Sequence, residues 1–215
     1  DINSLIPQTK TEGIDWKRLS SIHYTGNYQG QVDQFYTKGN LSTSLGNAIL
    51  DLNMNFKPQV PTYAGHIETD DFNIGQLIKQ SRIGTISMQG KIDGSGFNLD
   101  DLNAQIDATI SKIDIDTSHY HDITINGIVA KKKFDGIFIS KDPGLTLNFN
   151  GKVDLNGSKP VYQFTSRFIR FDLKKIGLTK ESVIGSGYAN LNFNGSTIDD
   201  FTGTASFTGI VLENN

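Results

Sequence analysis

The stretch LTLNFNGKVDL, residues 145–155, alternates between apolar and polar side chains along its whole length. Leu147, Phe149 and Val153 fall on one side of an extended chain, and Asn148 falls on the other. Because successive side chains of a β-strand point to opposite faces, this pattern predicts a long strand with one apolar and one polar face. What covers the apolar face becomes the central question about function.

The same alternation predicts strands along most of the chain, at 22–28, 41–45, 48–56, 86–92, 104–115, 123–129, 134–140, 162–168, 188–193 and 204–212. Ile110 and Ile113 are out of phase by one residue, and a β-bulge near Ser111 and Lys112 would return both to the same face. Helical signals are limited to single turns at 72–79 and 172–178, while 4–7 is too short to assign.

Composition excludes several classes of protein. The 215 residues contain no cysteine, which rules out zinc fingers, thiol nucleophiles and disulfide scaffolds. A net charge of −3 without a clustered basic face argues against a nucleic-acid partner, and the basic run 131–133 is interpreted as a solvated hairpin end. No apolar run is long enough to span a bilayer, no signal region opens the chain, and both ends are expected to be cut from a longer protein.

The sequence also repeats itself. Residues 96–102 (GFNLDDL) match residues 195–201 (GSTIDDF), 99 residues further on, and the same spacing pairs Tyr63 with Tyr162 without a gap. A weaker copy is proposed at 30–35. This self-similarity predicts one continuous β-array in three parts: an N-terminal repeat at 1–62, a second repeat at 63–161 and the start of a third at 162–215.

The candidate chemical motifs favour structural roles. The carboxylate pairs at 100–101 and 199–200 are interpreted as turn residues rather than metal ligands, because neighbouring side chains on a strand point apart. His119 and His121 share a strand face, and an exposed strand end is favoured over a metal site. No serine has a nucleophile-elbow context and no phosphate loop is present. The sequence therefore predicts no enzyme, no metal and no cofactor.

Two architectures would cover the apolar face. Two sheets can pack as a β-sandwich, or one sheet can curl into a trough whose inside meets something hydrophobic; periodicity does not separate them. For the same reason, the aromatic side chains of this face are consistent with a packed core and with the lining of a channel. They are Phe149, Phe164, Phe168, Phe171, Phe193 and Phe207.

Most of the chain resembles the TamB family of AsmA-like envelope proteins of Gram-negative bacteria, in the version typical of Bacteroidetes-like bacteria. The likeness lies in residues 72–77 (FNIGQL), 94–102 (GSGFNLDDL), 134–136 (FDG) and 194–201 (NGSTIDDF), with an earlier repeat around 39–46 (GNLSTSLG). These motifs are spaced glycines, acids and hydrophobic residues, without a catalytic signature. The family's N-terminal membrane anchor and C-terminal module have no counterpart in this sequence.

The resemblance implies an all-β fold, an elongated and curled antiparallel sheet (a "β-taco") with an apolar inner groove in the periplasm. It also implies transport of phospholipid between the inner and outer membranes and a link to outer-membrane biogenesis. The expected partners are phospholipid acyl chains and, for the full-length protein, an inner-membrane anchor and an outer-membrane β-barrel.

The side chains predicted to line the groove belong to the apolar faces of the expected strands. They are Ile86, Met88, Ile92, Ile106, Ala108, Ile110, Ile125, Leu145, Leu147, Phe149, Val153, Leu191, Phe193, Ala205 and Phe207. Two alternatives stay open: a structural or adhesive β-sandwich, and a chaperone surface that receives unfolded β-strands during outer-membrane protein assembly or secretion.

Overall fold

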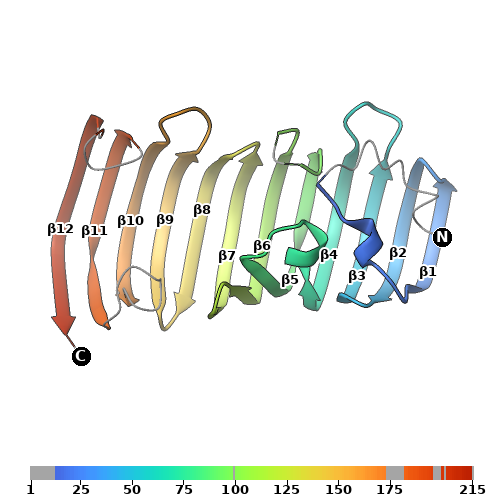
Figure 1. Ribbon diagram of the computed structural model, residues 1–215, viewed down its shortest axis with the longest axis horizontal. Coiled ribbons are helices and arrows are strands. Elements are labelled where there is room, and N and C mark those ends of the chain that lie inside the picture. The colour runs from blue at the N-terminus through green and yellow to red at the C-terminus, as the bar shows by residue number, and fades with distance from the viewer. Residues whose placement is uncertain (1–12, 99, 173–181, 196–199, 201, 215) are drawn as a thin grey trace.

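A computed structural model describes residues 13–98, 100–172, 182–195, 200 and 202–214. Its strands form one antiparallel sheet of 12 strands whose spatial order is the order of the chain (Figure 1). The strands are β1 (His23–Gln31), β2 (Gln34–Thr43), β3 (Gly46–Asn55), β4 (Thr62–Asn73), β5 (Ile83–Ser95), β6 (Asn103–Ile115), β7 (Ser118–Ala130), β8 (Lys133–Asp142), β9 (Leu145–Asp154), β10 (Val161–Asp172), β11 (Val183–Asn194) and β12 (Thr202–Asn214). The described helices are a 3-10 turn, η3 (Trp16–Arg18), and one short helix, α1 (Ile74–Leu77).

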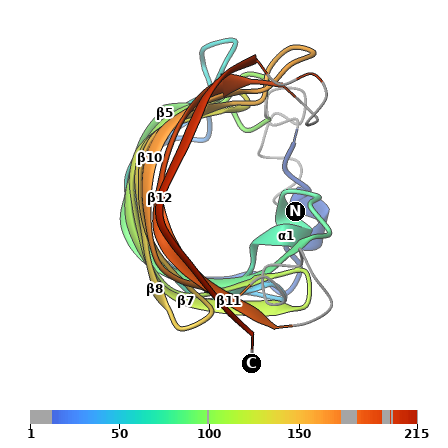
Figure 2. The same ribbon diagram turned by 90° about the vertical axis from the view of Figure 1, so that its left-hand side faces the viewer.

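The sheet is curled but not closed. Seen from its end, it bends into a C-shaped arc, so the molecule is a trough whose long axis crosses the strands (Figure 2). In the described part of the chain, the substantial contacts between elements join neighbouring strands, and otherwise join α1 to β5 and to η3. No second described sheet faces the first. The elongated, curled β-sheet is therefore confirmed, and the β-sandwich alternative is wrong.

The apolar face is the concave one. Ile74 of α1, which lies across the mouth of the trough in Figure 2, packs against a buried cluster of Ile86, Ile110 and Ile123. Residues that pair directly across an antiparallel sheet share a face, so the pairing register extends this assignment from β5, β6 and β7 to every other strand. We call this concave, apolar surface of the sheet the inner face.

Bulges help the strands to bend. The predicted bulge is confirmed: Met88 pairs with Ile110 while Ser87 pairs with Lys112, so the backbone register with β5 skips Ser111. The extra residue returns Ile113 to the inner face. Similar register shifts occur in β4, β10 and at the pairing of β11 with β12. Because bulges increase local bending and twist, they favour an arc over a flat sheet.

The 99-residue spacing of the sequence is present in the backbone. β1 to β6 and β7 to β12 follow one another in the same order, and corresponding turns close with corresponding bonds. Three bonds from a backbone N–H to a backbone carbonyl in the first half recur 99 positions later. The bond from Phe56 to Asp33 (2.7 Å) corresponds to that from Leu155 to Lys132 (2.9 Å). In the same way, Asn73 to Leu45 (2.6 Å) corresponds to Asp172 to Gly144 (3.0 Å), and Gly96 to Pro61 (2.9 Å) corresponds to Gly195 to Pro160 (3.0 Å). The division of the chain at 62 and 161 stays a prediction.

Some boundaries differ from the sequence expectations. β4 was not predicted, because its inner positions include Gly65 and Thr69 and give a weak apolar alternation. The strand expected at 41–45 is the end of a longer one, β2, that stops at Thr43. Leu155, expected on the apolar face, follows the end of β9 and is half exposed. The helical turn predicted within 72–79 is confirmed by α1, whereas the predicted turn at 172–178 and the segment 4–7 lie almost entirely outside the described residues.

Candidate hydrophobic groove

The register brings all fifteen predicted groove residues onto the inner face, in rows that run along the trough. Met88, Ile110 and Leu147 share one row; Ala108, Ile125, Phe149 and Phe207 share the central one; and Ile92, Ile106, Leu191 and Ala205 share a third. Ile86 and Leu145 lie beyond the bulges, near one rim, and Val153 and Phe193 lie near the other. These positions establish a common surface, and their role in holding a ligand stays a prediction.

Further inner-face side chains were not on the predicted list. Ile123 packs with Ile86 and Ile110, and Phe138 lies against the same cluster. Phe134 pairs with Val153, and Phe138 with Phe149, from the neighbouring strand β8. The alternation at 123–129 and 134–140 was the signal that would have placed them there.

Aromatic rings form a row over a small-residue floor in the C-terminal half. The ring centroids of Phe134 and Phe149 are 5.9 Å apart, and those of Phe149 and Phe164 are 4.7 Å apart. Next to them, Gly136 pairs with both Gly127 and Gly151, so three adjacent strands carry no side chain on the inner face at this level. The aromatic side chains lie over this row: a Cβ atom at Gly127 would be 3.1 Å from the ring of Phe134, and one at Gly151 would be 2.7 Å from the Cβ of Phe164.

A segment that we call the strap, residues 13–20, crosses the mouth of the trough in its N-terminal half (Figure 2). Near one rim, the indole of Trp16 contacts the ring of Phe97 edge-on, at 6.4 Å between centroids. At the opposite rim, Ser44 donates its N–H to the Ser20 carbonyl at 2.9 Å, and Leu19 is buried against Leu45 and Phe72.

The helix α1 lies beside the strap and is tied to it. Leu77, at the end of α1, accepts the backbone N–H of Asp15 at 2.7 Å. Together the strap and α1 cover the inner face over β2 to β5.

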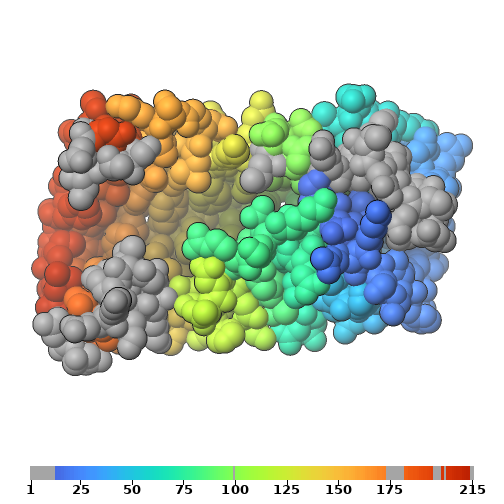
Figure 3. All heavy atoms as spheres, in the orientation of Figure 1, coloured from blue at the N-terminus to red at the C-terminus, as the bar shows by residue number. Residues whose placement is uncertain are grey.

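Beyond this cover the inner face is hollowed and accessible. Figure 3 shows the hollow between the two rims over the yellow and orange strands, and none of the described helices lies over β9 to β11 there. Phe149, Phe164 and Leu191 are only half buried, and Phe207 on β12 is 59% exposed. Asp142, the last residue of β8, is a buried charged residue at the rim end of an inner row, and its carboxylate accepts the N–H of Gly144 at 2.7 Å.

The outer face is largely polar and carries cross-strand ion pairs, although Ile49, Ile128, Ile137 and Tyr188 are also exposed on it. Lys38 contacts Asp51 at 2.8 Å in the first half, and Lys152 contacts Asp135 at 3.0 Å in the second. Hydrogen bonds from Lys38, and then from Tyr36, hold the pKa of Asp51 below its ordinary value. The two faces of the sheet therefore differ in chemistry, because the ion pairs and most of the polar side chains lie on the convex side.

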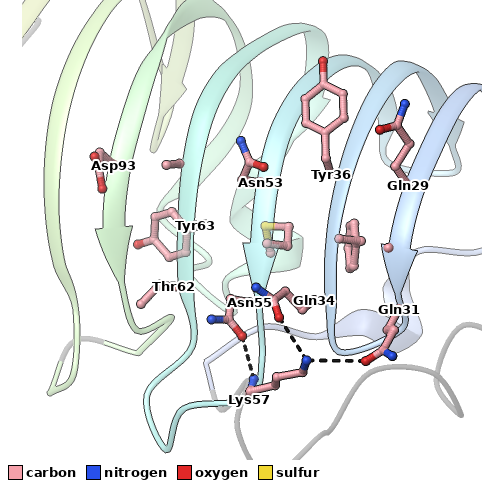
Figure 4. A pocket seen from close by; sticks show the side chains of 14 residues that line it. Gln29, Gln31, Gln34, Tyr36, Asn53, Asn55, Lys57, Thr62, Tyr63 and Asp93 are labelled. Carbon is pink, nitrogen blue, oxygen red and sulfur yellow. Dashed lines mark hydrogen bonds between the residues drawn. The ribbon is translucent and has the colours of Figure 1, made fainter.

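The outer face also has a polar hollow of about 580 Å³ over β1 to β5 (Figure 4). Its lining is dominated by amide side chains, and Lys57 donates hydrogen bonds to Gln34 at 2.9 Å and to Gln31 at 3.4 Å. Besides the amides, the hollow offers hydrogen-bonding groups from Tyr36, Thr62 and Asp93.

The motifs weighed for metal or acid–base chemistry are accounted for by local bonds. The Asn98 side chain accepts the N–H groups of Asp100 and Asp101, both at 2.9 Å, which is the predicted turn role. Asp199 lies outside the described residues. His119 and His121 are exposed near the start of β7 and bond to carboxylates through Nδ1, His119 to Asp114 at 2.7 Å and His121 to Asp122 at 2.8 Å. Within the described ranges, no three His, Asp or Glu side chains converge as a metal site.

Among the described residues, no helix has the length and apolar character needed to cross a membrane. Comparison of the chain with models of known protein families, with curated proteins and with solved structures gives no significant match. The trough and its register are therefore the basis for assigning a function.

Proposed function

We propose that this chain is a non-enzymatic segment of a periplasmic, bridge-like lipid carrier. Phospholipid acyl chains lie in the trough and move along it between the inner and outer membranes. The observation that carries the proposal is the accessible apolar surface of the inner face over β9 to β11, where Phe149, Phe164 and Leu191 are only partly covered by protein. A partly exposed apolar surface that continues across neighbouring strands is typical of a site that is covered by a hydrophobic partner.

The physical chemistry of the inner face suits a hydrocarbon chain. Burial of each CH₂ group stabilises the bound lipid by about 0.8 kcal/mol, and these contacts have no preferred direction. A chain lying along the rows exchanges one set of equivalent contacts for the next as it slides.

Membrane attachment and an outer-membrane β-barrel partner are proposed for the full-length protein from the TamB resemblance alone. The residues of this chain contribute the groove, and the polar outer face is suited to an aqueous compartment such as the periplasm.

The test is lipid retention and transfer with a matched pair of variants. Phe149→Asp places a carboxylate on the inner face, and Asn150→Asp places the same group on the outer face of the same strand. Native mass spectrometry of the gently purified chain should detect bound phospholipid in the parent and in Asn150→Asp, and at least about tenfold less in Phe149→Asp. Unchanged retention in Phe149→Asp, with the β-sheet circular dichroism preserved, would contradict the groove role.

A chaperone function is the second candidate, since the partly exposed apolar surface around Phe149 and Phe164 also suits the apolar face of an unfolded β-strand from another protein. Retention of unfolded polypeptide without phospholipid in the same mass spectra would favour this function over lipid transport.

A further inference from the structure

The polar hollow on the outer face is built by two neighbouring rows of side chains that cross β1 to β5 (Figure 4). Residues that pair directly across the strands form each row, because they share a face of the sheet. The first row is Gln29, Tyr36, Asn53, Ala64 and Asp93, and the second is Gln31, Gln34, Asn55 and Thr62. The volume of about 580 Å³ falls within the range of ligand sites, about 300–1,000 Å³.

The hollow gathers hydrogen-bonding groups that the protein does not use. In the described part of the chain, the side chains of Gln29, Asn53 and Asp93 make no hydrogen bond or ion pair. The amide oxygens of Gln31 and Gln34 accept hydrogen bonds from Lys57, at 3.4 and 2.9 Å, which leaves their NH₂ groups as donors. Because an amide both donates and accepts, such a cluster suits a ligand with many hydroxyl groups.

Tyr36 adds an aromatic ring among these amides. Its hydroxyl donates to the carboxylate of Asp51 at 2.9 Å, which fixes the position of the ring. The residue is only partly buried, and Figure 4 shows its ring between Gln29 and Asn53. The apolar face of an aromatic ring suits the C–H side of a sugar ring, while the neighbouring amides suit the sugar hydroxyls.

The second half of the chain shows that strand pairing does not require these amides. At the positions 99 residues later, two ion pairs replace four residues of the hollow. The correspondences are Tyr36 with Asp135, Asn53 with Lys152, Gln34 with Lys133, and Asn55 with Asp154. Lys152 contacts Asp135 at 3.0 Å, and Lys133 contacts Asp154 at 2.7 Å. The same strands therefore pair with side chains that satisfy one another, and the unused amides of the first half point to a ligand.

We propose that the outer-face hollow binds a neutral oligosaccharide, with one sugar ring against Tyr36 and the sugar hydroxyls bonded to Gln29 and Asn53. The lining contains one cation, Lys57, and one anion, Asp93, so it carries no net charge that would select a charged ligand. The rows cross five strands spaced about 4.8 Å apart, which gives a length of about 19 Å and suits several linked sugars. The site lies on the face opposite the groove, and its ligand is independent of lipid.

Saturation-transfer NMR with two soluble probes, cellotetraose and N-acetylated chitotetraose, tests this site. Magnetisation should pass from the parent chain to at least one of the two tetrasaccharides. The double variant Tyr36→Asp, Asn53→Lys copies the ion pair of the second half and should bind that probe at least about tenfold more weakly. The control Gln163→Ala removes an exposed outer-face amide of β10 and should bind the probe as the parent does.

A second variant covers the case in which the double variant does not fold. Tyr36→Leu removes the aromatic ring without adding a charge, and it should also weaken binding at least about tenfold. Circular dichroism checks that each variant keeps its β-sheet. Absence of transfer from the parent to either probe, or a folded variant of Tyr36 that binds as tightly as the parent, would overturn the proposal.

Discussion

The ring of Phe149 lies 4.7 Å from the ring of Phe164, although the two residues do not pair directly across the sheet. Phe149 is opposite Ser166, and Phe164 is opposite Gly151, so the rings meet on the diagonal. The absence of a side chain at Gly151 gives the ring of Phe164 space above the neighbouring strand.

This contact should be measurable as a coupling energy. We expect a double-mutant cycle with Phe149→Leu and Phe164→Leu to give about 0.5–1.5 kcal/mol, the range for aromatic pairs beyond simple burial. Urea unfolding followed by circular dichroism provides the four free energies. Strict additivity of the two single changes would show that the rings are neighbours without mutual stabilisation.

Gly136→Ala should destabilise the sheet. A Cβ atom at this position would lie 2.5 Å from the Cα of Gly127 and closer still to the Asn126 carbonyl oxygen, and both are backbone atoms that cannot rotate away. Forced overpacking of this kind costs about 1–3 kcal/mol. Thr124→Ala, on the outer face of β7, is the control and should change the free energy of unfolding by less than about 0.5 kcal/mol. Equal urea midpoints for the two variants would contradict this account.

The strap should open more often when Leu45, which packs against Leu19 at the rim, is shortened to alanine. Leu45→Ala removes most of the side chain that packs against Leu19, without changing the strap itself. A loss of about 2 kcal/mol, at the low end for a buried leucine, raises the open population about 30-fold. Tryptic cleavage after Lys17 or Arg18 should accelerate accordingly, while Ser42→Ala should be cleaved as the parent is. Equal cleavage rates would mean that hydrogen bonds, such as Ser44 to Ser20, hold the strap alone.

Alkaline pH should weaken the fold through Tyr63. Burial raises the pKa of Tyr63 to about 12, from an ordinary value of 10.0. The fold favours the neutral phenol, so this contribution is complete below pH 10 and is lost as the pH rises through about 12. At about 1.4 kcal/mol for each pH unit, the difference in pKa corresponds to a loss of about 3 kcal/mol in the free energy of unfolding.

The comparison that isolates this effect is Tyr63→Phe. It loses the hydrogen bond from Tyr63 to the Gly96 carbonyl, at 3.0 Å, and so should be less stable than the parent at neutral pH. Between pH 10 and pH 12 it should lose less free energy of unfolding than the parent does. Parallel pH profiles for the two proteins would exclude Tyr63 as the source.

The alternation of apolar and polar residues was enough to place the predicted groove residues on one face. Every second residue of a strand lies on the same face, and directly paired residues of neighbouring strands share that face. Even the phase change between Ile110 and Ile113 was interpretable, since one inserted residue restores the face. β4 was not predicted because glycine and threonine occupy inner positions between Tyr63 and Phe72, which weakens the apolar alternation. This strand is instead stabilised by its pairing with β3 and β5.

The alternation of the sequence could not distinguish a trough from a β-sandwich. Both architectures need the same apolar face, and they differ only in what that face meets. The contact of Leu19 with Leu45 and Phe72 joins segments that are far apart in the chain, and no local periodicity encodes it. The accessible surface around Phe149 is likewise a property of the curl.

Because β7 to β12 repeat β1 to β6, the length of the sheet increases by a fixed amount with each repeat. Six strands spaced about 4.8 Å apart lengthen the sheet by about 29 Å, whatever side chains they carry. Each additional copy of the unit would therefore extend the reach of the trough by the same step. The distance that such a protein can bridge would then be set by the number of copies of this unit.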